Sequence, residues 1–593
     1  MLSPDDPGQP DKTGEADVSR KSSATPPRSG FADRYAAFAA RRAKPAAGFV
    51  SQPEPRSIGL YARGKQLLSG NILFSGHFAE APGTLLWDIP SPDPAFDADA
   101  HGFAWLDDLA ALGSPAARSL AQDWTWAWIA RYSAGFGPGW TPDLTGRRII
   151  RWVHHATLLL NGRDKDASVA YYRSLSQQSA FLARRWQAAA PGLPRFEALT
   201  GLVYAGISLI GMEKLVTPAT AALATDCRTE IDAEGGLPTR NPEELLEVLT
   251  LLTWSATALT EASRTVPHDL ADAIGRIAPA LRALRHADGD LARFHGGGKG
   301  VEGRLDQALA SAGVRPSATP AIAMGFARLN GRRTSVIVDA SAPPGGRAAA
   351  TAHASTTAFE MTSGRRAVIV NCGSGAPFGA AWRLAGRATP SHSVLSMDGM
   401  SSSRFSRRAD AELADRAAIT VSRLTVGIEG TDLYLAHDGW LRSHGLTTSR
   451  ALTLSQDGRR LTGVDALTAL TADARRRFED MMTETRLDGA AFSIRFHLHP
   501  EVDAALDLGG TAISLALRSG EIWVFRYSGS VKLSLQPSVY FEKGRLNPRP
   551  ATQIVLAGHA RGFETRIGWT LAKAQDTPLA IRDLESSDPE GQS

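Results

Sequence analysis

The chain of 593 residues is long enough for two to four domains with ample core. Hydrophobic residues make up 43% and charged residues 21%, which is ordinary for a soluble globular protein. The net charge of +4 is small for this length, and no nucleic-acid-binding motif accompanies it, so we expect no DNA or RNA partner. The pI of about 9.0 leaves room for a local basic face. Its arginines either line a groove for an acidic polymer or are solvated surface charges.

Cysteine content and hydropathy exclude several further classes. Cys227 and Cys372 lie in opposite halves without metal-ligand spacing, so neither a disulfide framework nor a structural zinc cluster is expected. No window of about 18 apolar residues occurs, so the sequence predicts no transmembrane helix. The N-terminus lacks the basic and apolar regions of a secretory signal, which predicts no classical export.

The N-terminal segment, residues 1–48, is predicted as a tail followed by a short basic helix. Residues up to about Gly30 are rich in Pro, Ser, Gly and charge, which is typical of disorder. Residues 31–44 have helical spacing and a basic end. This helix either docks on its own domain, which we favour, or touches a membrane surface.

Residues 49–318 are predicted as a helical domain. Segments with an apolar face at helical spacing follow one another with short connectors and without an intervening strand. This succession favours an array or toroid of helices over an α/β sheet. The segments are 103–112, 123–132, 147–160, 171–186, 196–211, 242–252 and 269–277.

Residues 319–576 change to an alternating pattern with many short strands, which predicts a large antiparallel β-sandwich, and 577–593 form a polar tail. Asp-Gly pairs at 398, 438, 457 and 488 are expected in turns. Residues 351–372 predict two strands joined at Ser363-Gly364, with His353 at the start of the first. This hairpin lies close to the boundary between the helical and strand-rich halves.

Seven segments, spread in order over both halves, carry a resemblance to a known family. They are PheAlaTrpLeuAspAspLeu at 103, ThrGlyArgArgIleIleArgTrp at 145, AspGlyAspLeuAlaArgPheHisGlyGlyGly at 288, ThrAlaHisAlaSerThrThrAlaPheGluMet at 351, SerHisSerValLeuSerMetAspGly at 391, AlaHisAspGlyTrp at 436 and ArgPheHisLeuHisPro at 495. Together they resemble the heparinase II/III-like family of polysaccharide lyases. The resemblance implies an incomplete (α/α) toroid followed by a multilayered β-sandwich, with the substrate between them. It also implies eliminative cleavage of a uronic-acid, glycosaminoglycan-like polysaccharide.

Elimination needs a base beside the uronate carboxylate, a donor for the leaving oxygen and a group that neutralises the carboxylate. His353 matches the second histidine of the family's His-x-His-x-Asp stretch, in which Thr351 and Ser355 replace the other two partners. His392 matches a His-Asn-Thr turn, with Ser393 in place of asparagine. Two histidines without the carboxylate make a weak divalent-metal site unless other oxygens complete it. Alternatively, His353 is a strand-end histidine bonded to a neighbouring loop.

Residues 234–242 form the loop in which the family often displays groups that face the substrate. Arg240 is expected to neutralise a carboxylate, and Asn241 either shares that charge or caps the helix that Pro242 begins. No tyrosine falls in an alignable motif, because Tyr171 and its neighbours lie in predicted helices.

The resemblance therefore implies a polysaccharide lyase with an acidic polysaccharide as substrate. The first alternative is a non-catalytic acidic-polysaccharide-binding or envelope-assembly protein, and the second is a hydrolase that uses paired carboxylates. The family favours the periplasm or cell envelope, whereas the N-terminus favours the cytoplasm. The polymer, the metal and the oligomeric state stay open. The predicted catalytic residues are His353, Asn241 and Arg240, and the predicted substrate-binding residues are His392, Arg293 and Trp440.

Overall fold

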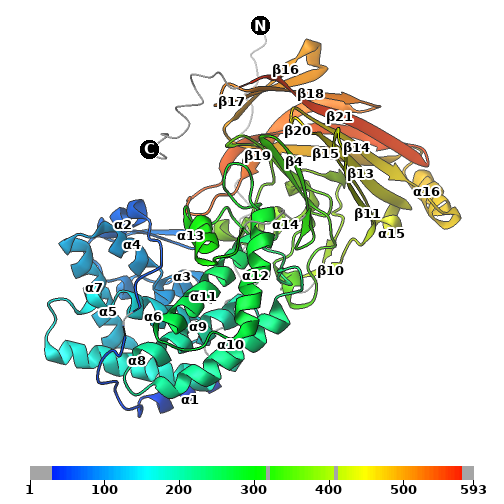
Figure 1. The fold of residues 1–593 in the computed structure, drawn as a ribbon. Helices are drawn as coiled ribbons and strands as arrows, with labels where there is room; N and C mark the ends of the chain where they lie inside the picture. The colour runs from blue at the N-terminus through cyan, green and yellow to red at the C-terminus, as the bar shows by residue number, and fades with distance from the viewer. Residues whose placement is uncertain (1–29, 52, 316–320, 407–411, 577–593) are drawn as a thin grey trace, which may run out of the picture.

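The computed structural model describes residues 30–51, 53–315, 321–406 and 412–576. It places helices in the N-terminal half and antiparallel sheets in the C-terminal half (Figure 1). The predicted fold class is therefore confirmed. The two predicted tails lie outside the described residues, apart from Gly30. The boundaries predicted at 49–318 and 319–576 stay predictions. Within the described ranges, no helix combines the length and apolarity that a membrane span requires.

The helical half is built around α9, whose residues from Phe196 to Ser208 are all buried. Helices α6, α8, α10 and α11 pack against it. Proline occupies the first turn of α3, α5, α6 and α11, where its missing N–H has no helical partner to lose. The helices are α1 (Phe31–Ala40), α2 (Tyr61–Leu68), α3 (Pro94–Gly102), α4 (Trp105–Leu112), α5 (Pro115–Tyr132), α6 (Pro142–His154), α7 (Ala156–Leu160), α8 (Lys165–Arg185), α9 (Leu193–Ser208), α10 (Val216–Glu230), α11 (Pro242–Glu261), α12 (His268–Ala283), α13 (Arg304–Ser311), α14 (Ala380–Arg387), α15 (Leu441–His444) and α16 (Ala472–Glu484).

Two large antiparallel sheets form the second half. One has the order β11-β12-β13-β14-β21-β18-β17-β16, and the other the order β19-β20-β15-β7-β6-β5-β4-β3, with β8 paired to β15. The strands are β3 (Ile322–Ala323), β4 (Phe326–Gly331), β5 (Thr334–Asp339), β6 (Phe359–Ser363), β7 (Arg366–Val370), β8 (Leu395–Met397), β9 (Arg404–Phe405), β10 (Leu413–Asp415), β11 (Ile419–Val426), β12 (Gly430–Trp440), β13 (Leu446–Ser455), β14 (Arg460–Thr468), β15 (Ala490–Leu498), β16 (Val502–Asp507), β17 (Ala512–Leu517), β18 (Ile522–Ser528), β19 (Lys532–Tyr540), β20 (Arg549–Ala560) and β21 (Glu564–Gln575).

A shared core joins the two sheets. Trp569 of β21 packs against Phe359 of β6 and Phe496 of β15, with ring centroids 5.7 and 4.8 Å apart. These aromatic side chains therefore bridge the two sheets, as expected for a sandwich.

Two local predictions in this half are wrong. The two strands are joined at Gly364-Arg365 rather than at Ser363-Gly364, because Ser363 still pairs with Arg366, and the first strand begins at Phe359. His353 therefore lies in the preceding loop rather than in a strand. The Asp438-Gly439 pair lies within β12, where the register shifts between His437 and Trp440, so it forms a strand irregularity and not a turn.

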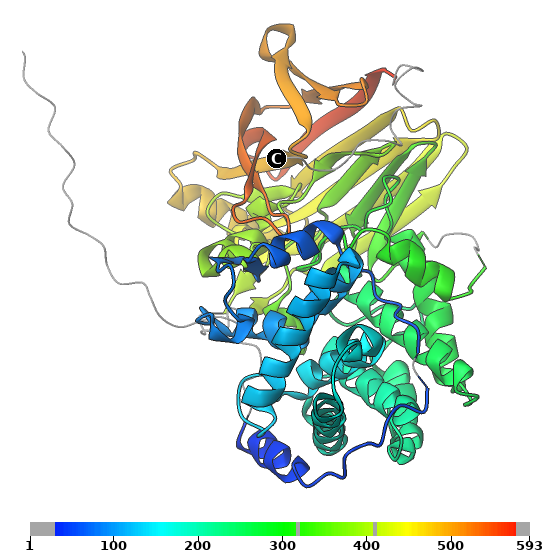
Figure 2. The ribbon, with the colours of Figure 1, turned by 90° about the vertical axis from the view of Figure 1, so that its left-hand side faces the viewer.

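The two halves meet across a continuous apolar core. Phe326, Ile337, Ala358 and Val394 come from the sheet half but belong to the same hydrophobic cluster as the helices. The hairpin of β1 (Asn71–Phe74) and β2 (His77–Glu80) approaches the sheet half, as the side view shows (Figure 2). This junction holds the candidate site.

Candidate functional site

Five polar side chains from separate segments meet in the buried junction. Arg240 lies two residues before α11, His295 lies in the glycine-rich loop after α12, and Asp339 ends β5. His353 and His392 come from the loops before β6 and β8. The structure thus brings together three of the predicted residues, Arg240, His353 and His392. It adds His295 and Asp339, which were not predicted.

The Arg240 guanidinium is engaged on all sides. Its nitrogens donate to the carbonyls of Met324, Gly325 and Ala342 at 2.9–3.0 Å, and Nη2 donates to Asp339 Oδ1 at 2.6 Å. Its side chain is only 10% exposed. Arg240 therefore fixes the end of α11 to the sheet half, and its donors already have partners within the protein.

Asp339 is the carboxylate of this junction, and it contacts Ser355, which stands at the acidic position of the family's His-x-His-x-Asp stretch. The residue is fully buried, and its Oδ2 accepts a hydrogen bond from Ser355 Oγ at 2.7 Å. Burial raises the pKa of Asp339, but the Arg240 charge and the hydrogen bonds of His295 and Ser355 outweigh it and hold that pKa well below its ordinary value. Asp339 is therefore an anion paired with Arg240.

Hydrogen bonds fix the tautomers of His353 and His392. The His353 backbone N–H donates to His295 Nδ1 at 3.2 Å, and His295 Nε2 lies 3.5 Å from Asp339 Oδ2 and 3.3 Å from Arg240 Nη1. His392 Nδ1 donates to the carbonyl of Ala388 at 2.9 Å, and its Nε2 accepts from His353 Nδ1 at 3.2 Å. His353 Nε2 is therefore left with a lone pair.

Burial keeps all three rings neutral. It lowers the pKa of His392 to about 4, and it lowers the pKa of His295. Burial also lowers the pKa of His353 well below its ordinary value, and the neighbouring His392 and His295 lower it further. A base with so low a pKa is a weak proton acceptor at neutral pH, because little driving force favours its protonation.

Strained backbone surrounds the cluster. Arg240, His295, Met324 and Thr357 have φ values of 50°, 48°, 49° and 66°, in the left-handed region that favours glycine. Each such residue costs on the order of 1–3 kcal/mol and persists only where contacts hold it in place. The dense hydrogen bonding of this junction supplies those contacts.

Asn241 adopts the capping role that the sequence offered as an alternative. Its Oδ1 accepts from the backbone N–H groups of Glu243 and Glu244 at 3.0 and 3.2 Å, and Pro242 begins α11.

We expect Asn241→Ala to lower the free energy of unfolding by about 1 kcal/mol, because two N–H groups of the first turn lose their acceptor. Asn241→Asp keeps that acceptor and is the matched control, with a change close to zero. Urea unfolding measures both. A neutral Asn241→Ala would contradict the capping role.

Arg293 lies in a neighbouring cluster. Its guanidinium stacks on the Tyr540 ring at 4.1 Å and donates to the carbonyl of Phe541. Arg293 and Tyr540 line a cavity of about 100 Å³ together with Glu243, Lys543 and residues 297–300 of the glycine-rich loop. Tyr540 thus lies beside the glycine-rich loop, although it makes no hydrogen bond or ring contact with the three histidines in the described residues.

Trp440 is not brought to this junction. It lies in the hydrophobic core of the sheet half with 0% exposure and packs against His437 at 5.3 Å between centroids. Its ring presents no face to a polysaccharide in this structure, and its substrate-binding role stays a prediction.

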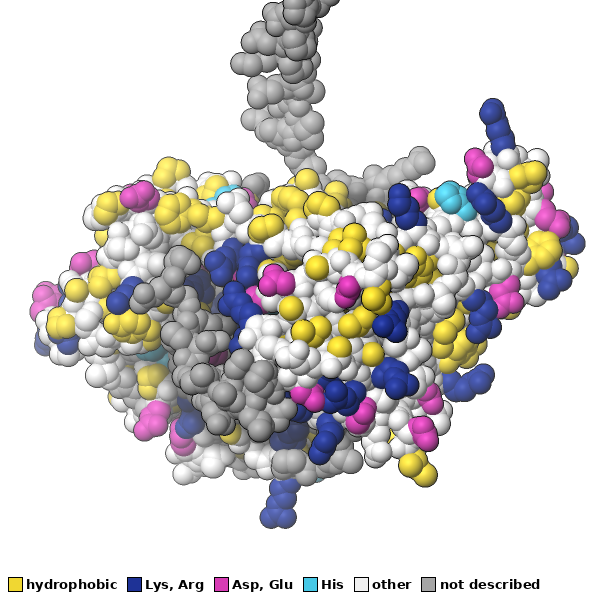
Figure 3. Space-filling model, turned by 90° about the horizontal axis from the view of Figure 1, so that it is seen from above, with side chains coloured by type: hydrophobic (Ala, Val, Ile, Leu, Met, Phe, Trp, Pro, Cys, Tyr) yellow, Lys and Arg dark blue, Asp and Glu magenta, His cyan; other side chains and the backbone are white. Residues whose placement is uncertain are grey.

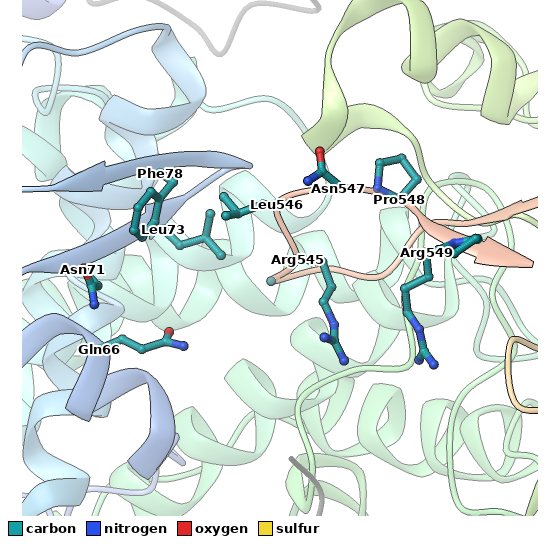
Figure 4. A pocket seen from close by; sticks show the side chains of 11 residues that line it. Gln66, Asn71, Leu73, Phe78, Arg545, Leu546, Asn547, Pro548 and Arg549 are labelled. Atoms are coloured by element: carbon teal, nitrogen blue, oxygen red, sulfur yellow. The ribbon is translucent and has the colours of Figure 1, made fainter. Parts of the chain in front are cut away.

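A larger cavity of about 460 Å³ opens where the β1–β2 hairpin faces the loop between β19 and β20 (Figure 4). Arg545 lies in that loop and Arg549 begins β20, and both contact Glu542, at 3.4 and 3.3 Å. Phe78 and Leu546 supply apolar walls. On the face seen in Figure 3, Lys and Arg side chains are spread from left of the middle to the right-hand edge, with Asp and Glu among them. The cavity at the junction of the halves holds two arginines, and Glu542 is paired with both.

Comparisons with known proteins place this geometry in a family. Residues 314–570 match the model of the heparinase II/III-like C-terminal domain. FtsZ-localized protein C of Caulobacter vibrioides (strain NA1000 / CB15N) is 32% identical over 550 residues, which are 89% of this chain and 91% of that protein. The chain belongs to the heparinase II/III-like family.

Solved structures of heparinase II/III-like proteins share the whole architecture. A heparinase III structure superposes with a TM-score of 0.66 at 13% identity, over 91% of this chain and 89% of that chain. A mutant of the heparan sulfate lyase HepC from Pedobacter heparinus gives 0.55 at 13% identity, over 92% and 88%. At such low identity these likenesses establish the fold alone.

The junction does not fit the metal site that some heparinase II/III-like proteins carry. Among the described residues, no group of three or more His, Cys, Asp or Glu side chains is arranged to hold a metal ion. Asp339 is engaged by the Arg240 cation, and His392 Nε2 is engaged by His353. The donor set thus forms an internal hydrogen-bond network.

The lowered pKa of buried His392 predicts that the protein loses stability in acid. Because the folded state disfavours protonated His392, the unfolded chain binds more protons once the pH falls below about 6.5, and stability is lost as the pH falls toward about 4. Glutamine does not titrate, so we expect His392→Gln to lose on the order of 3 kcal/mol less stability than wild type as the pH falls from about 7 to about 4. Urea unfolding of both proteins at about pH 7 and about pH 4 measures the difference. His268→Gln, on the exposed start of α12, is the control; equal pH dependence of His392→Gln and wild type would contradict the prediction.

Proposed function

We propose that this chain is an assembly protein that associates with FtsZ and is built on a polysaccharide-lyase fold without turnover of a polysaccharide. The proposal is supported by the relative that is 32% identical over most of both chains and is named for its localisation with FtsZ. The lyase structures match at 11–13% identity. Association with FtsZ requires that the chain lie in the same compartment as FtsZ.

The proposed absence of turnover is supported mainly by the contacts of Arg240, whose side chain is already bound within the protein. Elimination needs a positive group that neutralises the uronate carboxylate, because this makes the neighbouring proton acidic. The Arg240 cation forms an ion pair with Asp339, and its other N–H groups donate hydrogen bonds to three backbone carbonyls. Releasing it for a substrate would leave the buried Asp339 carboxylate without its cation, which is strongly unfavourable.

The proton donor supports the same conclusion. A lyase of this kind needs an acid for the leaving glycosidic oxygen. The aromatic ring nearest His295 and Arg240 belongs to Phe326, at 6.0 and 4.5 Å, and it has no hydroxyl group. In the described residues, no tyrosine hydroxyl bonds to His295, His353 or His392.

A binding titration with labelled FtsZ from the same organism tests the proposal. We expect saturable binding comparable to that of the Caulobacter relative, which serves as the positive control. Binding by the relative but not by this chain would refute the association. Polysaccharide turnover is measured in a separate assay. The result for FtsZ association therefore does not decide whether the chain cleaves a polysaccharide.

A lyase acting on an acidic polysaccharide is the second candidate function. His353 favours it, because its tautomer leaves Nε2 with a lone pair, as a general base requires. The cavity with Arg545 and Arg549 would hold the acidic sugar. If the chain is a lyase, incubation with its polysaccharide produces new unsaturated uronate ends. The assembly proposal predicts that no such ends form.

A further inference from the structure

The strand β11 forms an open edge of its sheet. It pairs with β12 on one side, and within the described residues no strand pairs with its other side. A hydrogen bond from the Gly427 N–H to the Gly430 carbonyl sets the alternation of the β11–β12 ladder. The backbone N–H and C=O groups of Ser422, Leu424 and Val426 therefore point away from β12, toward the place that a further strand would occupy.

The edge at β11 lacks the protection against strand pairing that the other three sheet edges have. Short strands, charged side chains and proline keep an edge from pairing with another chain. β3 has only two residues, β16 carries Asp503 and Asp507, and β19 carries Lys532 and Pro537. β11 has eight residues, no proline and one charged side chain. Its register shift lies at its beginning, so residues 421–426 pair regularly with β12 and present a regular outer edge.

The inner face of β11 is only partly covered by the opposing sheet. Leu424 lies opposite Leu433, which is 1% exposed, and packs at the border of the sandwich core. Val426, two residues further along the same face, is 73% exposed, and Ile428 at the tip of the hairpin is 90% exposed. The opposing strand β4 contacts β12 and β13. Apolar side chains thus lie at this edge where a strand of a partner would cover them.

We propose that β11 pairs with β11 of a second copy of the chain, antiparallel about a twofold axis, so that one sheet runs through both copies. A register centred on Leu424 places each Leu424 opposite its counterpart. Ser422 then exchanges hydrogen bonds with the partner's Val426, because both present their backbone groups at the edge. Arg423 lies opposite the partner's Thr425. A register centred on Arg423 would instead place two guanidinium groups opposite each other, which is unfavourable.

Charge complementarity favours a second copy as the occupant of this edge. Arg423 is exposed and makes no ion pair within the described residues. Asp432 is exposed on the same outer face, opposite Thr425 in β12, and accepts a hydrogen bond from Thr453 Oγ1 at 2.6 Å. In the register centred on Leu424, the partner's Asp432 lies two strand spacings from Arg423, about 10 Å between backbones, which the long arginine side chain spans. The twofold axis forms this pair twice. This inference does not depend on the association with FtsZ.

Sedimentation velocity of the full chain at about 1 to about 200 µM tests the inference. One strand pair is a small interface, so we expect a weak dimer whose share rises over this range. Ser422→Pro removes a backbone N–H that faces the open edge and no hydrogen bond to β12. It should weaken dimerisation at least about tenfold.

A charge exchange tests the proposed ion pair. Arg423→Asp places a second carboxylate near the partner's Asp432 and should weaken dimerisation at least about tenfold. Arg423→Asp combined with Asp432→Arg restores opposite charges and should return it to within about threefold of wild type. Arg526→Asp, at an exposed arginine of β18 in the same sheet, is the matched control and should dimerise like wild type. Far-UV circular dichroism checks that each variant keeps its fold.

A cysteine cross-link tests the register. Centred pairing brings the two Leu424 Cα atoms about 5.5 Å apart, which is within the range of a disulfide. Leu424→Cys should therefore form a covalent dimer on mild oxidation. Thr425→Cys is the control, because its two Cα atoms would lie roughly 8 Å apart, too far to be bridged. The natural cysteines, Cys227 and Cys372, are buried.

Two outcomes would overturn the inference. One is wild-type protein that stays monomeric up to about 200 µM, which would leave this edge to an extended segment of a different protein. The other is a dimer that Ser422→Pro and Arg423→Asp change no more than Arg526→Asp does, because such a dimer would form through another surface.

Discussion

Arg240→Ala is expected to lower the free energy of unfolding by about 3–5 kcal/mol, because it leaves the buried Asp339 carboxylate without its cation. The substitution also removes the donors of the carbonyls of Met324, Gly325 and Ala342, which hold the helical half against the sheet half. The junction should therefore become exposed to solvent at a lower urea concentration than in wild type. Urea unfolding and hydrogen exchange of residues 322–342 measure it.

Two further variants separate charge from geometry. Arg240→Lys keeps the charge but cannot reach Asp339 and three carbonyls at once, so we expect an intermediate loss. Arg476→Ala removes an arginine from an ion pair whose side chains are 71% and 86% exposed, and should change stability by less than about 0.5 kcal/mol. An Arg240→Ala effect as small as that of Arg476→Ala would contradict a structural role for the pair.

Arg450→Ala is expected to have an effect of similar size within the sheet half. Arg450 and Asp465 are each 1% exposed, and the guanidinium binds both carboxylate oxygens at 2.7 and 3.1 Å. Loss of one partner leaves a buried carboxylate that keeps only neutral donors such as Trp569 Nε1. We expect a loss of about 3–5 kcal/mol in urea unfolding.

The same substitution should also reach the histidine cluster. Arg450 Nη1 donates to the carbonyls of Thr357 and Ser393 at 2.9 and 2.8 Å, on the loops that carry His353 and His392. We therefore expect faster hydrogen exchange at residues 351–358 and 388–394. Unchanged exchange there would show that these loops are held without Arg450.

Periodicity was sufficient for the fold class because the pattern changes from helical to alternating spacing near residue 320. It failed at His353, since the apolar spacing of residues 351–358 suits a strand but these residues cross the junction as a loop. The prediction of a turn at Asp438-Gly439 was wrong for a related reason. Neighbouring strands held it in β12 against its turn preference.

The site was harder to predict because its partners are distant in sequence. Asp339 closes an apolar strand, and only the fold places it beside Arg240, 99 residues earlier. His295 lies in the segment ArgPheHisGlyGlyGly, which carried the family resemblance, yet nothing local indicated its bond to the His353 backbone. A charged residue at the end of a buried strand was the one available signal. It indicates a buried partner without identifying it.

Absorbance of unsaturated uronate ends tests the account most directly. The full chain and His353→Ala would be incubated with a panel of acidic polysaccharides, with an active heparinase as the positive control. The account predicts no increase in absorbance for either protein, because Arg240 is committed to Asp339 and the cluster has no acid for the leaving oxygen. An increase with wild type that disappears in His353→Ala would contradict it, and would establish a lyase with His353 in its mechanism.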